Sequence, residues 1–351
     1  MSKSKLWLKI FVPVLILLLM ALLAETLMRL FGVASNKNAE VKWRMKDQMA
    51  LLIKASALYP PTSPLFNTSL KDRPMLEHKN YPVLGASLRE YQYDLKKPDN
   101  AYRIIGLGDS FAWGWGVLDN RRTFFKLLEC WLQKENPAKT IELINASKPG
   151  AEINYYQDFL DSIGWGLNPD KVVISFNLND SYISYVSRTV DSKTAARMGR
   201  EQGFWTRHSR LIRFIWYRII QHQVRREYIE SVHDAYLGAN RSLHWERAQG
   251  NLRSIANECK KRKVGLIVVV FPLLFDLDRK YPFVDEMREI VKFLGENGFE
   301  YIDLLPTYLG KKSELLWTKP WDTHPNEVAH RMAAETIFKK LNSDVKKSSG
   351  Q

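Results

Sequence analysis

The sequence contains little cysteine, and its two cysteines lie far apart. Cys130 and Cys259 are the only ones among 351 residues, and no Cys-x-x-Cys pair or cysteine–histidine cluster has metal-ligand spacing. We therefore expect no metal and no cofactor. Each cysteine falls in a predicted amphipathic helix, where a buried free thiol is the usual state. An exported chain could instead join them in a disulfide if its fold brought them together.

Two common glycine-rich signatures are also missing. Gly108 stands two residues before Ser110, but Ala112 stands two residues after it, so the nucleophile elbow of α/β-hydrolases is absent. Phe111 occupies the third glycine position of a dinucleotide fingerprint that would begin at Gly106. The sequence shows no internal repeat.

Acidic residues are scarcer than basic ones. The chain has 38 Asp and Glu against 52 Lys and Arg, a formal net charge of +14. This excess favours an anionic environment such as lipid headgroups or acidic glycan over nucleic acid, although a well-solvated surface explains it equally well. Hydrophobic residues make up 45% of the chain, which is enough for a sizeable core and argues against global disorder.

One long apolar run lies at the N-terminus. The segment from Leu6 to Leu27 contains only Lys9 and Glu25 as charges, and about 20 such residues cross a bilayer as a helix. We predict a membrane anchor over residues 1–32, with a cleaved signal peptide as the alternative. Lys and Arg on both sides leave the positive-inside rule undecided. The short basic leader favours a single-pass inner-membrane protein whose main domain is periplasmic or otherwise extracytoplasmic.

Strand-like runs alternate with helical patterns after a juxtamembrane segment at 33–100. This alternation predicts one α/β domain over 101–345, with a parallel sheet covered by helices on both faces. We predict strands at 103–107, 141–144, 171–176, 264–271 and 301–304, and helices at 121–135, 154–163, 285–294 and 326–341.

A long interruption separates the third strand from the fourth. Residues 181–245 exceed an ordinary connection, and 205–220 alternate basic and bulky apolar side chains at helical spacing. One interpretation is a lid or an interfacial helix, with aromatic side chains in lipid or acyl chain. The other, which we favour, is a helix packed on the main domain with its arginines in solvent.

Polar side chains follow the predicted strands where ligands bind in open α/β sheets. Ser110 follows the first strand, Asn179 and Asp180 follow the third, and Asp322 and His324 precede the last helix. Taken singly, each could be an ordinary turn or capping residue. Together they supply the hydroxyl nucleophile, amide donor, acid and imidazole base that an ester hydrolase needs.

In this order the residues resemble the blocks of the SGNH, or GDSL-type, hydrolase family. Residues 108–111, Gly-Asp-Ser-Phe, look like its first block, Gly150 like its second, and residues 177–180, Asn-Leu-Asn-Asp, like its third. Asp322 and His324 look like its last block. The resemblance covers about 103–341 and implies a flavodoxin-like three-layer α/β/α fold with about five parallel strands. The resemblance implies a site with Ser110 as nucleophile, His324 as base, Asp322 as acid, and an oxyanion hole from the N–H groups of Ser110 and Gly150 and the Asn179 amide.

Two positions depart from the family pattern. Asn177 stands where the third block usually begins with glycine, and Asp322 lies two residues before His324 rather than three. Membrane-attached relatives share the shorter spacing. The alternative support for the His324 imidazole is a backbone carbonyl.

The function implied is a membrane-anchored carbohydrate esterase acting on acyl esters, with O-acetyl groups of cell-surface polysaccharide as the expected substrate. A lipase or thioesterase of the same fold, or a non-catalytic glycan-binding or assembly protein, are the alternatives. Trp113, Trp115, Trp165 and Trp317 could stack on sugars, although core packing explains them equally well. The sequence leaves open the acyl group, hydrolysis versus transfer, and the oligomeric state.

Overall fold

The chain divides into two compact units, a helical unit of residues 1–43 and 185–230 and a sheet unit of residues 44–184 and 231–351. The structure is a computed structural model, and it describes residues 3–31, 45–66, 77–81, 86–90, 95–181, 204–319 and 322–348. Parts of the predicted juxtamembrane segment and of the 181–245 interruption therefore lie outside the described residues.

Five parallel strands form the sheet at the centre of the sheet unit, in the order β4-β3-β5-β6-β7. β3 and β5 are buried along their whole length, as expected for parallel strands covered on both faces. The prediction of a parallel α/β sheet is confirmed, and each predicted strand is present. Their bounds are β3 Ala101–Leu107, β4 Thr140–Asn145, β5 Lys171–Asn177, β6 Gly265–Phe271 and β7 Tyr301–Asp303.

The strand order makes the chain change direction beside β3. From β3 it passes outward to β4, then returns to the other side of β3 and continues outward through β5, β6 and β7. This is the flavodoxin-like order, and ligands bind in such sheets where the connections on either side diverge, at the carboxyl ends of the strands. The end of β3 is therefore the expected place for a site.

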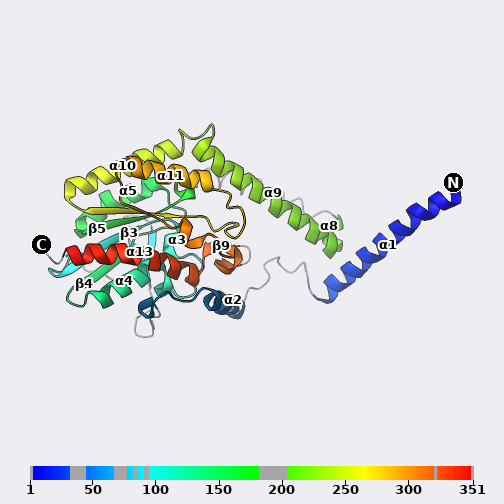
Figure 1. Cartoon of the computed structure of the whole chain (residues 1–351), viewed down its shortest axis with the longest axis horizontal. Helices are drawn as coiled ribbons and strands as arrows, with labels where there is room; N and C mark the ends of the chain where they lie inside the picture. Colours follow the sequence, from blue (N-terminus) through cyan, green and yellow to red (C-terminus); the bar gives the residue numbers. More distant parts are fainter. Residues whose placement is uncertain are drawn as a thin grey trace. The chain divides into compact units, whose positions relative to one another are not determined.

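Helices cover both faces of this sheet, and Figure 1 shows α4 and α13 on one face with α5, α10 and α11 on the other. Their apolar faces are buried against the strands, which gives the three-layer arrangement predicted from the sequence. The bounds are α4 Phe124–Glu135, α5 Ile153–Ser162, α10 Trp245–Arg262, α11 Val284–Glu296 and α13 Glu327–Lys347.

Several elements were not predicted. The helix around Cys259 was predicted without bounds and proves to be the long α10, and a small hairpin, β8 with β9, precedes α13 and was not predicted. α4 begins at Phe124 rather than at residue 121, because Thr123 adopts an extended backbone that ends a preceding 3-10 turn. The remaining bounds in this unit are α2 Met45–Leu58, β1 Glu77–Tyr81, β2 Ala86–Glu90, α3 Ser110–Trp113, α12 Leu305–Tyr308, β8 Trp317–Lys319 and β9 Asp322–Pro325.

The described part of the chain before β3 contributes to the sheet unit. The ring of Phe66 lies 4.4 Å from that of Trp131 and 5.5 Å from that of Phe338. Arg331 on α13 donates to the Tyr59 carbonyl oxygen, and Thr62 donates to Glu335 at 2.8 Å. Residues 59–66 are therefore docked on α4 and α13.

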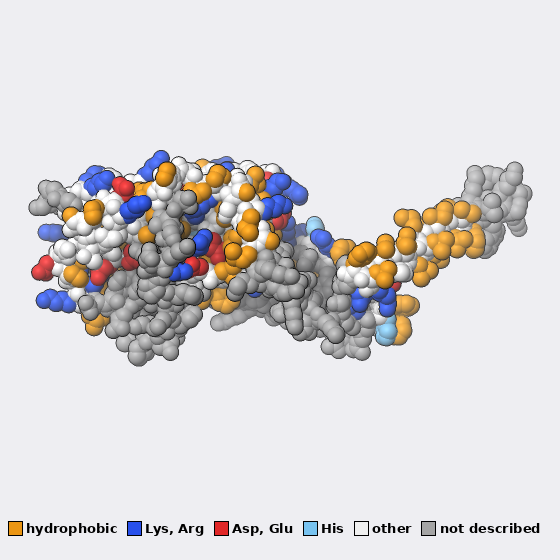
Figure 2. All heavy atoms as spheres, turned by 90° about the horizontal axis from the view of Figure 1, so that it is seen from below, with side chains coloured by type: hydrophobic (Ala, Val, Ile, Leu, Met, Phe, Trp, Pro, Cys, Tyr) orange, Lys and Arg blue, Asp and Glu red, His pale blue; other side chains and the backbone are white. Residues whose placement is uncertain are grey.

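The helical unit contains α1 (Lys3–Leu30), α8 (Phe204–His208) and most of α9 (Arg210–Leu237). Residues Phe11–Leu30 of α1 are long and apolar enough to cross a membrane, with a mean hydropathy of 2.4, as a signal sequence near the N-terminus also would be. Figure 2 shows hydrophobic side chains around this helix.

Both cysteines, which lie in the sheet unit, are free thiols, and burial raises the pKa of Cys259 to about 12.

Candidate active site

Ser110 is held at the carboxyl end of β3, on the first turn of the short helix α3. Asp109 caps this turn, because its carboxylate accepts a hydrogen bond of 2.9 Å from the Phe111 N–H. Gly108 allows the close approach of neighbouring chain, since a Cβ there would lie 2.5 Å from that of Ala112 and 3.1 Å from that of Ser175. The strand, the glycine and the cap together fix the position of the serine hydroxyl.

The shortened spacing between acid and base is explained by a strand. Asp322 and His324 lie on β9, and residues two apart on a strand project to the same side. Asp322 Oδ1 lies 2.5 Å from His324 Nδ1 and also accepts from the His324 N–H at 3.3 Å. The acid therefore reaches the imidazole directly, and the alternative of a backbone carbonyl is not needed.

The imidazole joins the two ends of the site. His324 Nε2 lies 2.9 Å from Ser110 Oγ, so serine, histidine and aspartate form one hydrogen-bonded chain. Burial acts to raise the pKa of Asp322, but the hydrogen bonds and charge of His324 outweigh it and hold this pKa below its ordinary value. Asp322 is therefore a carboxylate at neutral pH, as orienting an imidazole requires.

Two backbone donors in the segments that follow β3 and β4, the N–H groups of Ser110 and Gly150, form no hydrogen bond within the described chain. Ser110 stands at the start of α3, where helical N–H groups have no partner in the helix. Gly150 has a φ of +73°, a conformation that favours glycine. These are the two backbone groups that the sequence assigned to an oxyanion hole.

Asn179 lies beside the nucleophile but is tethered to Asp109. Its Nδ2 donates to Asp109 Oδ2 at 3.1 Å, and its backbone N–H donates to Asn177 Oδ1 at 3.4 Å. A side-chain amide carries two N–H groups, so one remains for a ligand. Asn177, which replaces the usual glycine, therefore helps to hold the turn that carries Asn179.

Two buried carboxyl groups lie behind this arrangement, and sequence reasoning gave neither a role. Burial raises the pKa of Asp109, partly offset by its hydrogen bonds. Burial, with the nearby charge of Asp109, raises the pKa of Asp180 well above its ordinary value. Asp180 Oδ2 accepts from the Tyr156 hydroxyl at 2.8 Å and from the Asn177 N–H at 3.0 Å, so it fixes the end of β5.

Three further residues that brace the site were missed. The Asn326 side chain caps α13 by accepting from the N–H groups of Val328 and Ala329, so the N-cap of this helix is Asn326 and not His324. Glu327 accepts from the Leu118 N–H at 2.7 Å, and Gln48 on α2 donates to the Gly116 carbonyl at 2.9 Å. Only Asn326 carried a sequence signal, as an Asn directly before a helical run.

The loop held by Glu327 and Gln48 presents an indole beside the base. Trp115 is 46% exposed, and its ring centroid lies 6.3 Å from that of His324. Of the other tryptophans considered as sugar platforms, Trp113 packs on Trp115 at 5.8 Å, and Trp317 donates to the Leu274 carbonyl at 2.7 Å. Trp115 is therefore placed to contact a substrate bound at Ser110.

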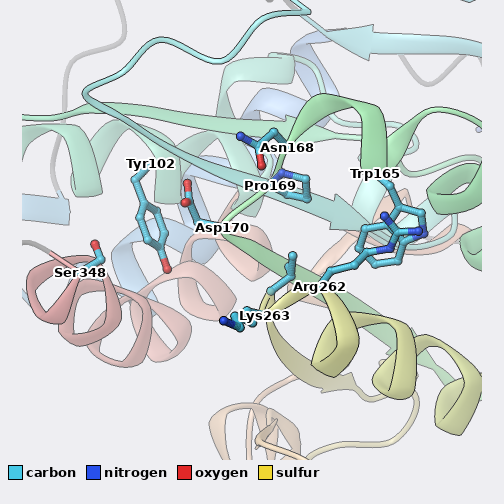
Figure 3. A pocket seen from close by; sticks show the side chains of 9 residues that line it. Tyr102, Trp165, Asn168, Pro169, Asp170, Arg262, Lys263 and Ser348 are labelled. Carbon is cyan, nitrogen blue, oxygen red and sulfur yellow. The ribbon is translucent and has the colours of Figure 1, made fainter. Parts of the chain in front are cut away.

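A separate polar hollow lies at the opposite edge of the sheet, where β3, β5 and β6 begin (Figure 3). Trp165 is on its wall, where the Arg262 guanidinium lies 4.9 Å from the indole centroid. The Asp170 carboxylate forms an ion pair with Lys97, at 2.7 Å, and accepts a hydrogen bond from the Arg103 N–H. Within the described residues, no group of three His, Cys, Asp or Glu side chains could hold a metal ion.

Comparison with known families decides the class. The sequence model of the GDSL-like lipase/acylhydrolase family matches residues 107–332, more than half of the chain. The chain belongs to this family. It is a serine esterase of the SGNH type, as its sequence blocks predicted, and the matched range includes Ser110, Gly150, Asn179, Asp322 and His324.

Solved structures of esterases show a similar chain path at low identity. A two-domain esterase active on acetylated mannans, crystallised with mannopentaose, is 15% identical with a TM-score of 0.40 over 69% of this chain, which spans 49% of that protein. The acetyl xylan esterase AlAXEase is 15% identical with a TM-score of 0.44, over 68% and 99% of the two chains. A catalytic mutant of an acetylxylan esterase from Geobacillus stearothermophilus is 14% identical with a TM-score of 0.44, over 68% and 94%. No curated protein sequence matches this chain.

Proposed function

We propose that Ser110, His324 and Asp322 form the catalytic triad of this esterase. The observation that carries the proposal is the continuous contact from Ser110 Oγ to His324 Nε2, at 2.9 Å, and from His324 Nδ1 to Asp322 Oδ1, at 2.5 Å. His324 removes the hydroxyl proton as Ser110 attacks the ester carbonyl, and Asp322 stabilises the imidazolium that forms.

The oxyanion that develops is received by the N–H groups of Ser110 and Gly150 and by the free N–H of the Asn179 amide. His324 then gives its proton to the departing alcohol, leaving an acyl group on Ser110. Water attacks this acyl-serine with His324 again as base, which releases the carboxylic acid and restores the serine. If a sugar hydroxyl replaces water, the same site transfers the acyl group.

The substrate that we propose is an O-acetyl ester of cell-surface carbohydrate. Trp115 supports a sugar over a lipid, because a half-exposed indole beside the base offers a flat apolar face while the loop that carries it is braced by Gln48 and Glu327. The proposal places this domain outside the cytoplasm, attached to the inner membrane through α1, since Lys3, Lys5 and Lys9 precede the apolar span of this helix.

An assay on two kinds of ester tests this proposal. Purified full-length protein in detergent is given an acetylated oligosaccharide and p-nitrophenyl esters of increasing chain length, alongside Ser110→Ala and His324→Ala. We expect acetate release from the oligosaccharide, lost in both variants at unchanged melting temperature. Activity that rises with acyl chain length would instead indicate a lipase, and no activity on any ester would favour a glycan-binding protein.

A reporter fusion tests the topology separately. Alkaline phosphatase, which needs the periplasm, and a fluorescent protein that folds in the cytoplasm are fused in turn after the last residue. We expect the phosphatase fusion alone to be active. The opposite pattern would remove cell-surface carbohydrate as the substrate while leaving the esterase chemistry untouched.

A further inference from the structure

The end of α1 and the start of α9 cap each other within the helical unit. The Glu25 carboxylate of α1 accepts from the backbone N–H groups of Arg210, at 3.1 Å, and Leu211, at 2.9 Å. The same carboxylate accepts from the Ser209 hydroxyl at 2.9 Å and from the Arg29 guanidinium at 2.8 Å. An acidic side chain from one helix thus satisfies the free N–H groups of another, where the helix dipole favours it.

The capping is reciprocal. Arg210 donates to the carbonyl oxygens of Met28, at 2.9 Å, and Arg29, at 3.2 Å, which are among the unpaired carbonyls at the end of α1. Arg29 in turn donates to the His208 carbonyl at 2.6 Å. Glu25 and Arg29, both within six residues of the end of the apolar span at Leu30, therefore hold the end of α8 and the start of α9 against α1.

An exposed apolar patch lies on both sides of this junction. On α8, Phe204 is 66% exposed and Trp205 is 68% exposed. On α9, the exposed apolar residues recur at helical spacing along one face. We call these six residues the α8–α9 patch, and they are Phe204, Trp205, Ile212, Ile215, Trp216 and Ile219.

The patch ends abruptly while the exposed face of α9 continues. Residues Gln223, Arg226 and Glu230 follow Ile219 along the same face, at intervals of three or four, and all are exposed. Arg218 flanks the patch, with its guanidinium 5.3 Å from the centroid of the Phe214 ring. Bulky apolar and aromatic side chains bordered by arginine suit the boundary between acyl chains and anionic headgroups.

We propose that α8 and the first three turns of α9 lie in the headgroup region of the membrane that α1 enters, with the α8–α9 patch inserted at the acyl boundary. This rests on the proposed anchoring by α1. The junction at Glu25 argues for lipid as the occupant, because it holds the patch at the end of the span, within reach of a bilayer surface.

Site-directed fluorescence on the full chain in nanodiscs of phosphatidylcholine and phosphatidylglycerol tests the proposal. Cys130→Ser and Cys259→Ser provide the background, and single probe sites are made by Ile215→Cys and Ile219→Cys. The matched control is Glu230→Cys, further along the same exposed face, and Leu17→Cys reports insertion of α1. Each site carries an environment-sensitive fluorophore, and spin-labelled lipids serve as quenchers.

We expect probes at 215 and 219 to show blue-shifted emission and quenching by lipids labelled near the headgroup, with no quenching at 230. The probe at 17 should be quenched by lipids labelled deep in the acyl chain. Quenching at 17 with none at 215 and 219 would overturn the docking proposal and leave the anchor standing. No quenching at 17 would mean that the anchoring itself is wrong.

Two further results separate lipid from other occupants. Blue-shifted probes at 215 and 219 that no lipid quenches would show that protein covers the patch, either a second copy or the sheet unit, and would contradict the proposal. Glu25→Ala should reduce quenching at 215 and 219 while leaving that at 17 unchanged, because it removes the cap on α9 but not the span. Unchanged quenching at 215 and 219 would contradict the role given to the junction.

Discussion

The two edges of the parallel sheet differ in how their polar groups are paired. At the amino edge the charges are paired: Arg103 is fully buried and donates to Glu142 at 2.6 Å, and Lys171 pairs with Asp344 and with Glu300. At the carboxyl edge the N–H groups of Ser110 and Gly150 form no hydrogen bond within the described chain. The comparison separates an edge with paired charges, which supports the fold, from an edge with unpaired N–H groups, which we propose to bind a ligand.

Among the substitutions that compare the two edges, the largest loss should follow Asp322→Asn. An amide can donate to His324 Nδ1 and so stabilise the tautomer that cannot accept the Ser110 proton, and we expect kcat to fall on the order of 10³–10⁴-fold. Asp170→Asn removes a carboxylate from the amino edge and is the control, for which kcat should hold. Esterase kinetics on a short acyl ester measure both, and equal losses would erase the distinction between the edges.

Asn179→Ala should be the next most damaging change. Removing one oxyanion donor typically costs about 10²–10³-fold in kcat, while KM changes little because the interaction is made in the transition state. Asn168→Gly is the control at the amino edge, with glycine chosen because φ at Asn168 is +51°. A loss in KM alone for Asn179→Ala would make this residue a ground-state binding group instead.

A smaller effect, on KM, is expected for Trp115→Ala, with Trp165→Ala as its control. Trp115→Ala should raise KM for an acetylated oligosaccharide about 10-fold, which corresponds to 1.4 kcal/mol of stacking. It should leave KM for p-nitrophenyl acetate nearly unchanged, since that ester carries no sugar. Trp165→Ala, beside the hollow of Figure 3, should change neither constant. Matching shifts in both variants would point to a general packing role.

Glu142→Ala should have the smallest effect on kcat of these substitutions, although it should destabilise the protein most. Glu142→Ala leaves the Arg103 guanidinium buried without its carboxylate, which typically costs about 3–5 kcal/mol of unfolding free energy. Chemical denaturation measures this loss, and kcat of the folded fraction at low temperature should match the wild type. Asp285→Ala, which breaks an exposed pair with Arg288, should cost less than about 1 kcal/mol. A fall in kcat for Glu142→Ala would show that the edges are coupled.

The sequence predicted the sheet and the order of the site residues because both depend on local pattern. The Val- and Ile-rich run at 264–271 has the continuous apolar pattern of a strand covered on both faces, and Ser110 follows another predicted strand. The short spacing of Asp322 and His324 could not be interpreted without the β8–β9 hairpin, whose three- and four-residue strands carry too little pattern to be found.

Long-range hydrogen bonds account for most of what the sequence did not predict. Gln48 reaches Gly116, Glu327 reaches Leu118, and Glu25 reaches Arg210 across large separations in the chain. A polar residue on a helix looks the same in the sequence whether its side chain is solvated or bound to a distant backbone group. The apolar spacing of 205–220 correctly indicated helix, but spacing alone does not say what an exposed face contacts.

Labelling by a fluorophosphonate tests the central claim most directly, because only a serine activated by a base at the carboxyl edge should react. The purified full-length protein is treated with the reagent, and the adduct is located by peptide mass spectrometry. We predict one adduct per chain, on Ser110, which is absent in Ser110→Ala and forms far more slowly in His324→Ala. No adduct, or an adduct on another serine that persists in Ser110→Ala, would contradict the account.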